Sequence, residues 1–175
     1  MPNVQVSSNV SSAGVDKVKV MAAISKALAT ALDKSEQVVM VHLNLDMPML
    51  FQASDACYHH AVRHVTSNVP KSNVDVPTAL RALSKALSEA LGKPEAYVMV
   101  QLDLDTPMIF QASDAPCAFI QIRSIGRIGP DLNPKTAASL TTMAAEALKI
   151  PADRIFLNLD DVDAANWAMA GNTIG

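Results

Sequence analysis

One stretch of this chain occurs twice. The six residues FQASDA stand at 51–56 and again, letter for letter, at 110–115. When the sequence is shifted by 59 positions, residues 6–56 align with residues 65–115 without a gap, and "VMVHLNLDMPMLFQASDA" meets "VMVQLDLDTPMIFQASDA". About half of the aligned positions are identical, which is too many for chance and indicates an internal duplication.

Each copy has the pattern of a strand, a helix and a second strand. In the first copy, residues 18–32 predict an amphipathic helix, and residues 39–46 alternate between apolar and polar, as in a half-buried strand. In the second copy, Gly92 followed by Pro94 is a typical helix end, and a matching strand follows. The apolar face expected for the first helix consists of Val20, Met21, Ile24, Ala27, Leu28 and Ala31.

Residues 117–175 follow the same plan more loosely. "CAFIQIRSIG" predicts a strand, a helix begins at Asn133 or Pro134, and "DRIFLNLDD" predicts a further strand. The chain therefore contains three βαβ units. A helical crossover of this length makes the two strands of a unit parallel. We expect an α/β fold (α+β in some schemes) with a mixed sheet and helices packed on one face.

Composition excludes several classes of function. Half of the residues are hydrophobic, 18% are charged, the net charge is −3, and no Lys/Arg cluster indicates a nucleic-acid partner. No apolar run reaches membrane length, and the start has neither the basic nor the apolar region of a signal peptide, so we expect a cytoplasmic protein without membrane insertion. Cys57 and Cys117 do not form a CxxC motif. His59, His60 and His64 lie where the chain enters a strand at the junction of the two copies, so we expect no metal site there.

Five short motifs, in order and at matching spacing, carry a family resemblance. They are "GKP" at 92–94, "PCA" at 116–118, "SIGRIG" at 124–129, "DRIFLN" at 153–158 and "DAAN" at 163–166. Between about Val65 and Trp167 the sequence resembles macrophage migration inhibitory factor and its relatives in the tautomerase superfamily. The opening "MPNVQV" also resembles the start of this family, whose mature proteins begin with proline.

The resemblance implies a fold and a function. The family fold has two βαβ units related by a pseudo-twofold axis, and three subunits form a barrel-like trimer with a pocket at each subunit boundary. Its members act without a cofactor as phenylpyruvate tautomerases or L-dopachrome isomerases, interconverting keto and enol forms of small aromatic acids. Several also act outside the cell as cytokines on cell-surface receptors, after leaving by a route that needs no signal peptide.

A family subunit needs two units, and this chain has three. Residues 1–59 therefore correspond to an extra first half, and residues 60–175 to a complete subunit. The family's catalytic base is its N-terminal proline, which matches Pro2 once Met1 is removed. An α-amine has a pKa of roughly 7.7–8.0, and burial or a nearby cation lowers it further, so such a base is neutral at physiological pH. The complete copy has Ala61 at this place, inside the chain, where the nitrogen is a non-basic amide.

The resemblance also assigns binding residues. Lys93 of "GKP" matches the lysine that binds the substrate carboxylate, and Lys34 is its copy, although "DKS" replaces "GKP" there. Ser124 and Ile125 match positions of the pocket wall, and Asn158 matches an asparagine that the neighbouring subunit contributes.

Two positions depart from the family. Phe156 stands where many relatives have tyrosine. The phenylalanine ring can still form part of the pocket wall, but it lacks the hydroxyl donor. A phenylalanine in a strand is more often a buried core residue than part of a binding site. The second cysteine of the family's CxxC is missing after Cys117, which excludes exchange of the two-cysteine kind and predicts a small buried residue.

The sequence leaves two arrangements open. In one, residues 2–56 pair with residues 117–175 and residues 58–116 form an insert; in the other, residues 61–175 form the body and the extra unit docks so that Pro2 reaches a pocket. Two joined alternative first exons give the same pattern. An unmated third unit leaves a helix face and a sheet edge open, which predicts an assembly unlike the plain trimer or poor solubility. The functional alternatives are a tautomerase and a cytokine-like binding protein with a vestigial pocket.

Overall fold

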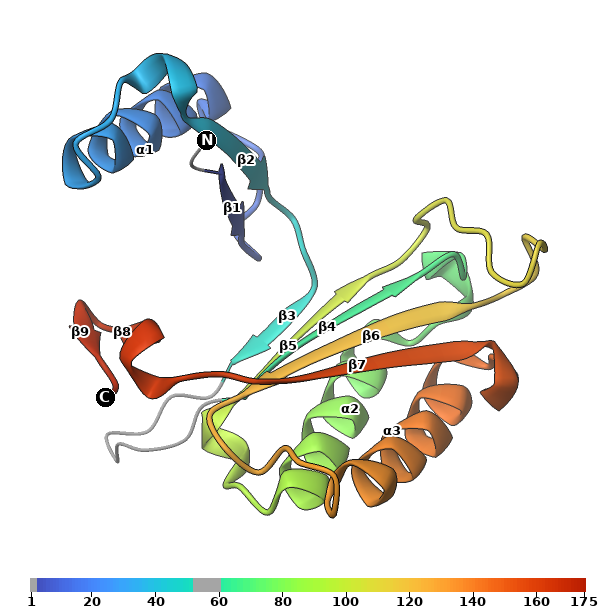
Figure 1. The fold of residues 1–175 in the computed structure, drawn as a ribbon. Coiled ribbons are helices and arrows are strands. Elements are labelled where there is room, and N and C mark those ends of the chain that lie inside the picture. The colour runs from blue at the N-terminus through green and yellow to red at the C-terminus, as the bar shows by residue number, and fades with distance from the viewer. Residues whose placement is uncertain (1–2, 52–60) are drawn as a thin grey trace. The chain divides into compact units, whose positions relative to one another are not determined.

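The chain separates into two compact units in a computed structural model that describes residues 3–51 and 61–175. Unit 1 is Met1–Pro48 and unit 2 is Met49–Gly175. Figure 1 shows the elements of both. Three βαβ units are present, and in each of them the two strands are parallel, as the sequence predicts.

Unit 1 contains one βαβ unit. Strand β1 (Asn3–Ser7) pairs with β2 (Met40–Asn44), and helix α1 (Lys17–Ala31) joins them. The helix begins after Asp16, whose carboxylate accepts a hydrogen bond from the Lys19 amide and so caps an end that would otherwise leave its N–H groups unpaired.

The apolar face of α1 is only partly covered. Val20, Met21, Ile24 and Leu28 are half-buried, whereas Ala27 and Ala31, which the sequence pattern also assigns to this face, are exposed. Ala29 is the buried residue of the helix. A two-stranded sheet is too narrow to cover a 15-residue helix, so unit 1 has an apolar surface but no closed core.

Unit 2 is built on a five-stranded mixed sheet. Its order is β3-β5-β4-β6-β7. The central strand β4 (Ala61–Ser67) is parallel to β5 (Val98–Asp103) and antiparallel to β6 (Ala118–Ser124), and β6 is parallel to β7 (Ile155–Asp161). The edge strand β3 (Met49–Phe51) is antiparallel to β5.

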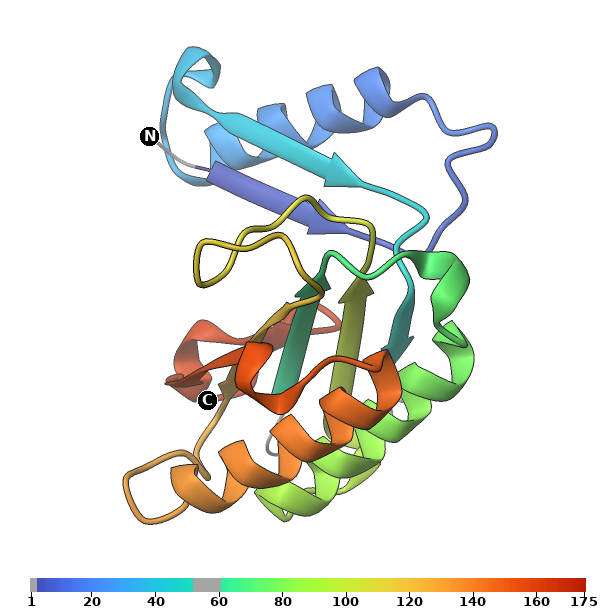
Figure 2. The ribbon, with the colours of Figure 1, turned by 90° about the vertical axis from the view of Figure 1, so that its right-hand side faces the viewer.

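Two helices cover one face of this sheet, as Figures 1 and 2 show. They are α2 (Val76–Leu91) and α3 (Asn133–Leu148), and they pack against each other. Strands β5 and β6 alternate between buried residues on the helix side and half-exposed residues on the other. The core lies between the helices and the sheet. Its fully buried residues include Leu83, Leu87, Leu102, Ile120, Ile122, Leu140 and Leu148.

Short elements complete the chain. A 3₁₀ turn precedes the second strand of each βαβ unit, at Glu36–Val38, Glu95–Tyr97 and Ala152–Arg154. Two further turns are Lys71–Asn73 and Ala164–Asn166, and the C-terminal hairpin pairs β8 (Ala168–Met169) with β9 (Asn172–Thr173).

Candidate active site

Lys93 is held at the end of α2 with its side chain directed into unit 2. Gly92 ends the helix with a φ of 61°, a conformation that glycine adopts at little cost, and a Cβ there would lie 2.8 Å from the end of the Arg127 side chain. The Lys93 backbone is tied to Ser88, whose carbonyl accepts from the Lys93 amide (3.0 Å) and whose hydroxyl donates to the Lys93 carbonyl (2.6 Å). Lys93 is 5% exposed.

The Lys93 ammonium lies beside two of the predicted wall residues. It donates to Ser124 Oγ at 2.5 Å and to the Ile125 carbonyl at 2.9 Å. The Ser124 hydroxyl donates onward to the Gly126 carbonyl, and the Gly126 amide donates to Asp161. Burial lowers the Lys93 pKa to about 8, with Asp161 raising it and Arg127 lowering it. We call this group, Lys93, Ser124, Ile125 and Asp161, the lysine cluster.

The residue that aligns with Pro2 in the second copy, Ala61, lies beside the lysine cluster in the sheet. Ala61 is the first residue of β4, and its backbone is in register with Ser124 on β6. Its nitrogen is a peptide amide, which has no basic lone pair. Pro2, the predicted base, lies outside the described residues.

Lys34, the first copy's counterpart of Lys93, has a different environment. It lies in unit 1, is exposed, and follows Asp33, which takes a φ of 50° where the second copy has glycine. Its amide donates to the Ala29 carbonyl, which matches the Lys93–Ser88 bond.

Phe156 and Asn158 lie on the other face of the sheet. Phe156 packs against the rings of Phe119 (6.2 Å between centroids) and Phe110 (6.3 Å). Asn158, with its amide nitrogen turned toward the carboxylate, donates to Asp160 at 3.0 Å, and Gln121 donates to the same carboxylate at 3.3 Å. An apolar hollow of about 280 Å³ adjoins the rings. It is lined by Met108, Ile109, Phe110, Cys117, Ala118, Phe119 and Phe156.

The expectation that favoured a core role for Phe156 is wrong, because its side chain is 57% exposed. Ile155 and Leu157 face the helices, which turns Phe156 to the uncovered face. Cys117 is a buried free cysteine, as predicted.

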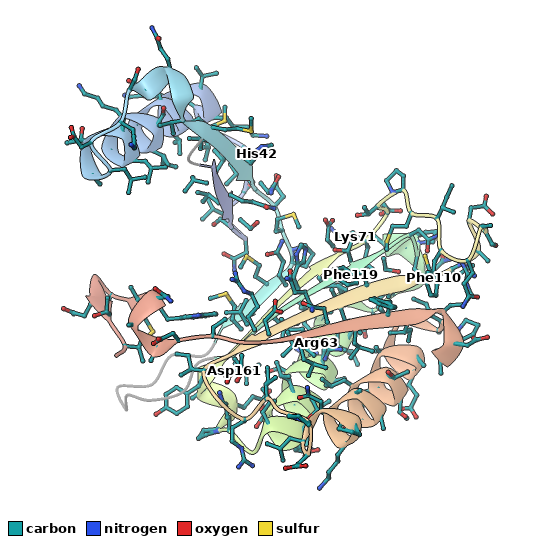
Figure 3. The ribbon with its side chains drawn as sticks, viewed as in Figure 1. His42, Arg63, Lys71, Phe110, Phe119 and Asp161 are labelled. Carbon is teal, nitrogen blue, oxygen red and sulfur yellow. The ribbon has the colours of Figure 1, made fainter. Side chains whose placement is uncertain are left out.

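Unit 2 does not bring its five predicted binding residues, Lys93, Ser124, Ile125, Phe156 and Asn158, together in one place. Phe156 is near the start of β7, and Asp161, in register with Ser124, is at its end, roughly 16 Å farther along at 3.3 Å per residue. The Phe156 side chain and the lysine cluster also face opposite sides of the sheet. Figure 3 shows Phe110 and Phe119 toward one end of the sheet and Asp161 toward the other.

The residue patterns did not single out three charged side chains. Arg63 on β4 is fully buried (Figure 3), and its Nε and one terminal nitrogen have no hydrogen-bond partner in the described part of the chain. Arg127 donates to the Leu91 carbonyl, and Arg154 donates to four carbonyls of residues 110–116. For Arg63 a signal was available, since its strand alternates and places it on the same face as Val65.

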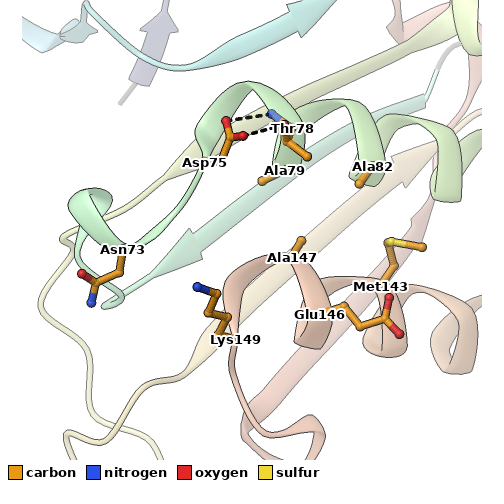
Figure 4. Close-up of a pocket in the computed structure, with 9 residues that line it drawn as sticks. All are labelled: Asn73, Asp75, Thr78, Ala79, Ala82, Met143, Glu146, Ala147 and Lys149. Carbon is orange, nitrogen blue, oxygen red and sulfur yellow. Dashed lines mark hydrogen bonds between the residues drawn. The ribbon is translucent and has the colours of Figure 1, made fainter.

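A second hollow, of about 310 Å³, lies between α2 and α3 (Figure 4). It is lined by Asn73, Asp75, Thr78, Ala79, Ala82, Met143, Glu146, Ala147 and Lys149. Asp75 caps α2: hydrogen bonds from the Thr78 hydroxyl and amide lower its pKa. That carboxylate is therefore committed to capping the helix.

The described part of the chain lacks two other kinds of feature. In residues 3–51 and 61–175, no three His, Cys, Asp or Glu side chains are grouped so that they could hold a metal ion. Within the same residues, no helix is both long and apolar enough to cross a membrane.

Comparison with known proteins identifies the family. The family described as "Macrophage migration inhibitory factor (MIF)" matches residues 1–64 and 60–175. A macrophage migration inhibitory factor homolog of Brugia malayi is 34% identical over 111 residues, covering 63% of this chain and 96% of that protein. The protein of Meriones unguiculatus is 38% identical over 109 residues, covering 62% and 94%.

Solved structures agree. The homologue from Prochlorococcus marinus superposes with a TM-score of 0.60 at 32% identity, covering 65% of this chain and 99% of that one. The Trichinella spiralis protein gives a TM-score of 0.61 at 27% identity, covering 64% and 98%. Taken with the βαβ units and the lysine cluster, these matches show that the chain belongs to the macrophage migration inhibitory factor family and carries an extra N-terminal βαβ unit.

Proposed function

We propose that this protein is a cofactor-free keto–enol tautomerase, of the phenylpyruvate tautomerase or L-dopachrome isomerase type. The observation that carries the proposal is the lysine cluster: a buried ammonium that donates to Ser124 and Ile125 beside the strand position of the family's base. A cation with few water contacts binds a carboxylate more strongly than an exposed one, because desolvation strengthens the Coulomb attraction.

The reaction is a proton transfer. The neutral Pro2 amine removes a proton from the carbon next to the substrate carbonyl, and the carbonyl oxygen gains a proton as the enol forms. Lys93, or Lys34 as its copy, binds the substrate carboxylate and keeps it in place during the transfer. Acid and base both come from amino-acid side chains, the terminal amine or solvent, so the reaction needs no cofactor.

The remaining wall of the pocket is proposed to come from a neighbouring subunit of a homotrimer. Phe156 and Asn158 are far from the lysine cluster of their own chain, and the family resemblance places the pocket at a subunit boundary. Phe156 offers an apolar ring to a small aromatic acid, and Asn158 offers an amide donor.

The test is phenylpyruvate tautomerisation by the purified protein, beside Pro2→Gly, Lys93→Gln and Lys34→Gln variants. Pro2→Gly keeps an α-amine but loses the ring that fixes its position, so we expect kcat to fall by up to about 10²-fold, the cost of misplacing a catalytic group. Of the two lysine variants, the one that removes the cation that binds the substrate carboxylate raises KM. A kcat unchanged in Pro2→Gly refutes the proposed base.

The second candidate is a non-catalytic, cytokine-like binding protein with a vestigial pocket. Ala61 favours it, because the position of the base in the complete copy holds a peptide nitrogen. Such a protein acts on a cell-surface receptor. Absence of tautomerisation in a protein whose circular dichroism shows a folded chain supports this candidate over the first.

A further inference from the structure

The two copies of the first βαβ half have the same internal geometry. In β1–β2, Val4 pairs with Val41 and Ser7 with Asn44; in β4–β5, Arg63 pairs with Val100 and Thr66 with Asp103. Every pair is displaced by the 59 positions of the repeat, so the register is identical. Both helices begin after an aspartate cap, at Asp16 and Asp75.

The turn that follows each second strand is also the same. The Asp46 amide donates to the Val10 carbonyl at 3.0 Å, and the Asp105 amide donates to the Val69 carbonyl at 3.1 Å. Asp46 and Asp105 both have a positive φ, 59° and 58°. Unit 1 is thus folded as the half that unit 2 uses in its core.

The first copy also keeps the polar side chains with which the second copy holds its partner half. Ser67 donates to the Cys117 carbonyl, and Asn68 Oδ1 accepts from the Cys117 amide. Lys93 donates to Ser124 and Ile125. The counterparts in the first copy are the identical residues Ser8, Asn9 and Lys34.

The apolar positions are preserved as well. Leu83, Leu87, Val100 and Leu102, which are fully buried in unit 2, correspond to Ile24, Leu28, Val41 and Leu43. In unit 1 these four are only half-buried. The first copy therefore has the surface that fits a β6–α3–β7 half.

At one buried position the first copy is the better fit. Arg63 is fully buried and two of its nitrogens have no partner in the described residues, whereas its counterpart is Val4. A buried unpaired cation is costly, and valine at that place removes the cost.

We propose that residues 3–44 take the place of residues 61–103 against β6, α3 and β7 of the same chain, so that the two copies compete for one partner half. In the present arrangement, residues 61–103 occupy this place, and the buried Arg63 disfavours it. The same arrangement is favoured about tenfold by loop closure, because its connection to β6 is residues 104–117, whereas the exchanged arrangement needs residues 45–117. If the proposed function holds, on which this consequence rests, exchange puts β1 in the register that β4 has beside β6, and Lys34 in the place of Lys93 beside Ser124.

Disulfide trapping tests the exchange. Thr66 is in register with Phe119, so Thr66→Cys/Phe119→Cys reports the arrangement described above, and Ser7→Cys/Phe119→Cys reports the exchanged one. Both pairs are made in a Cys57→Ser/Cys117→Ala background and oxidised mildly at low protein concentration. Ser11→Cys/Phe119→Cys, with an exposed cysteine outside the strands, measures random collision.

We expect both reporter bonds to form within single chains, with the 7–119 bond forming at least severalfold faster than the 11–119 bond. Arg63→Val and Val4→Arg each slow the 7–119 bond severalfold, the first because it removes the cost of the competing arrangement and the second because it gives the exchanged arrangement the same cost. A 7–119 bond no faster than the collision control, or one unaffected by Val4→Arg, overturns the proposal. A 7–119 bond found only between two chains also overturns it, in favour of a swap between copies.

Hydrogen exchange gives a second readout without new cysteines. In the exchanged arrangement α2 loses its partner while α3 keeps one, so α2 amides are expected to exchange faster than α3 amides, and Arg63→Val is expected to reduce the difference. Equal protection of the two helices contradicts the exchange. Neither readout needs catalysis. An inactive protein that forms the 7–119 bond therefore refutes the proposed tautomerase activity but not the exchange.

Discussion

The Arg63 side chain lies wholly inside unit 2, where it makes one long hydrogen bond, from its Nη1 to the Leu83 carbonyl at 3.4 Å. Burial lowers its pKa to about 9, so the guanidinium is still charged at pH 7. Replacing buried charges with hydrophobic side chains of similar volume stabilises some proteins by about 1–4 kcal/mol. We expect Arg63→Met to raise the free energy of unfolding by an amount in this range, measured by urea denaturation.

The matched control is Arg123→Met. Arg123 is on the neighbouring strand β6, and its side chain is exposed on the opposite face of the sheet. Its removal should change stability by less than about 0.5 kcal/mol. A destabilised Arg63→Met protein beside an unchanged Arg123→Met protein contradicts the claim that the buried charge is a net cost.

The lowered pKa of Lys93 gives a pH dependence. The ammonium is charged below about pH 8 in the folded protein and up to about pH 10.5 in the unfolded chain. The unfolded state therefore binds more protons between these values, and the contribution of Lys93 to stability increases with pH across that window. Lys93→Met should flatten the slope of unfolding free energy against pH there; an unchanged slope contradicts the shifted pKa.

At the scale of elements, Arg154 holds residues 110–116, the segment that precedes β6, through hydrogen bonds. Its guanidinium donates to the carbonyls of Phe110, Ser113, Ala115 and Pro116 and lies 5.7 Å from the Phe110 ring centroid. A lysine keeps the charge but cannot reproduce this planar set of donors. Arg154→Lys should cost about 1–3 kcal/mol and speed hydrogen exchange in residues 110–116. Lys135→Arg, at an exposed site on α3, serves as the control and should have no effect.

The elements themselves were largely predictable. The duplication, the helix over residues 18–32, the glycine stop at Gly92 and the helix start at Asn133 all follow from local periodicity and capping, which depend on neighbours in sequence. The family motif also assigned Lys93, Ser124 and Ile125 to one pocket, and hydrogen bonds join these three residues in the structure, whereas their role in binding a substrate stays a prediction.

Hydrophobic periodicity does not show whether a second layer packs against a given face of a helix or sheet. Ala27 and Ala31 have the spacing of a core face, but no second layer covers them within unit 1. Phe156 alternates as a strand residue, yet its face of the sheet is the one without helices. Burial depends on tertiary neighbours. The duplication repeats the apolar pattern of the first half of the fold, but it does not repeat the second half that covers this pattern.

At the scale of the whole molecule, the two units should differ in resistance to proteolysis. Unit 1 has one helix over two strands and exposes Val18, Leu32 and Met40, whereas unit 2 has a continuous core. Unit 1, Met1–Pro48, is close to the size of about 40 residues below which a domain usually needs disulfides, metals or oligomerisation to be stable. We expect a low dose of a broad-specificity protease to cut unit 1 first and leave a fragment beginning near Met49, identified by mass spectrometry. Equal digestion of both units contradicts this.

Assembly is the last property that the surface predicts. Phe156 and Ile109 are 57% and 78% exposed beside an apolar hollow, and the family resemblance implies a trimer. An interface that buries this aromatic cluster should tolerate Phe156→Tyr, which keeps the ring, and reject Phe156→Glu, which buries an unpaired charge. Sedimentation at micromolar concentration should show an oligomer for the wild type and Phe156→Tyr and a monomer for Phe156→Glu. Because Phe156 is exposed in the single chain, the monomer should unfold at nearly the wild-type urea concentration when both are diluted below assembly. A Phe156→Glu protein that still assembles places the interface elsewhere on unit 2.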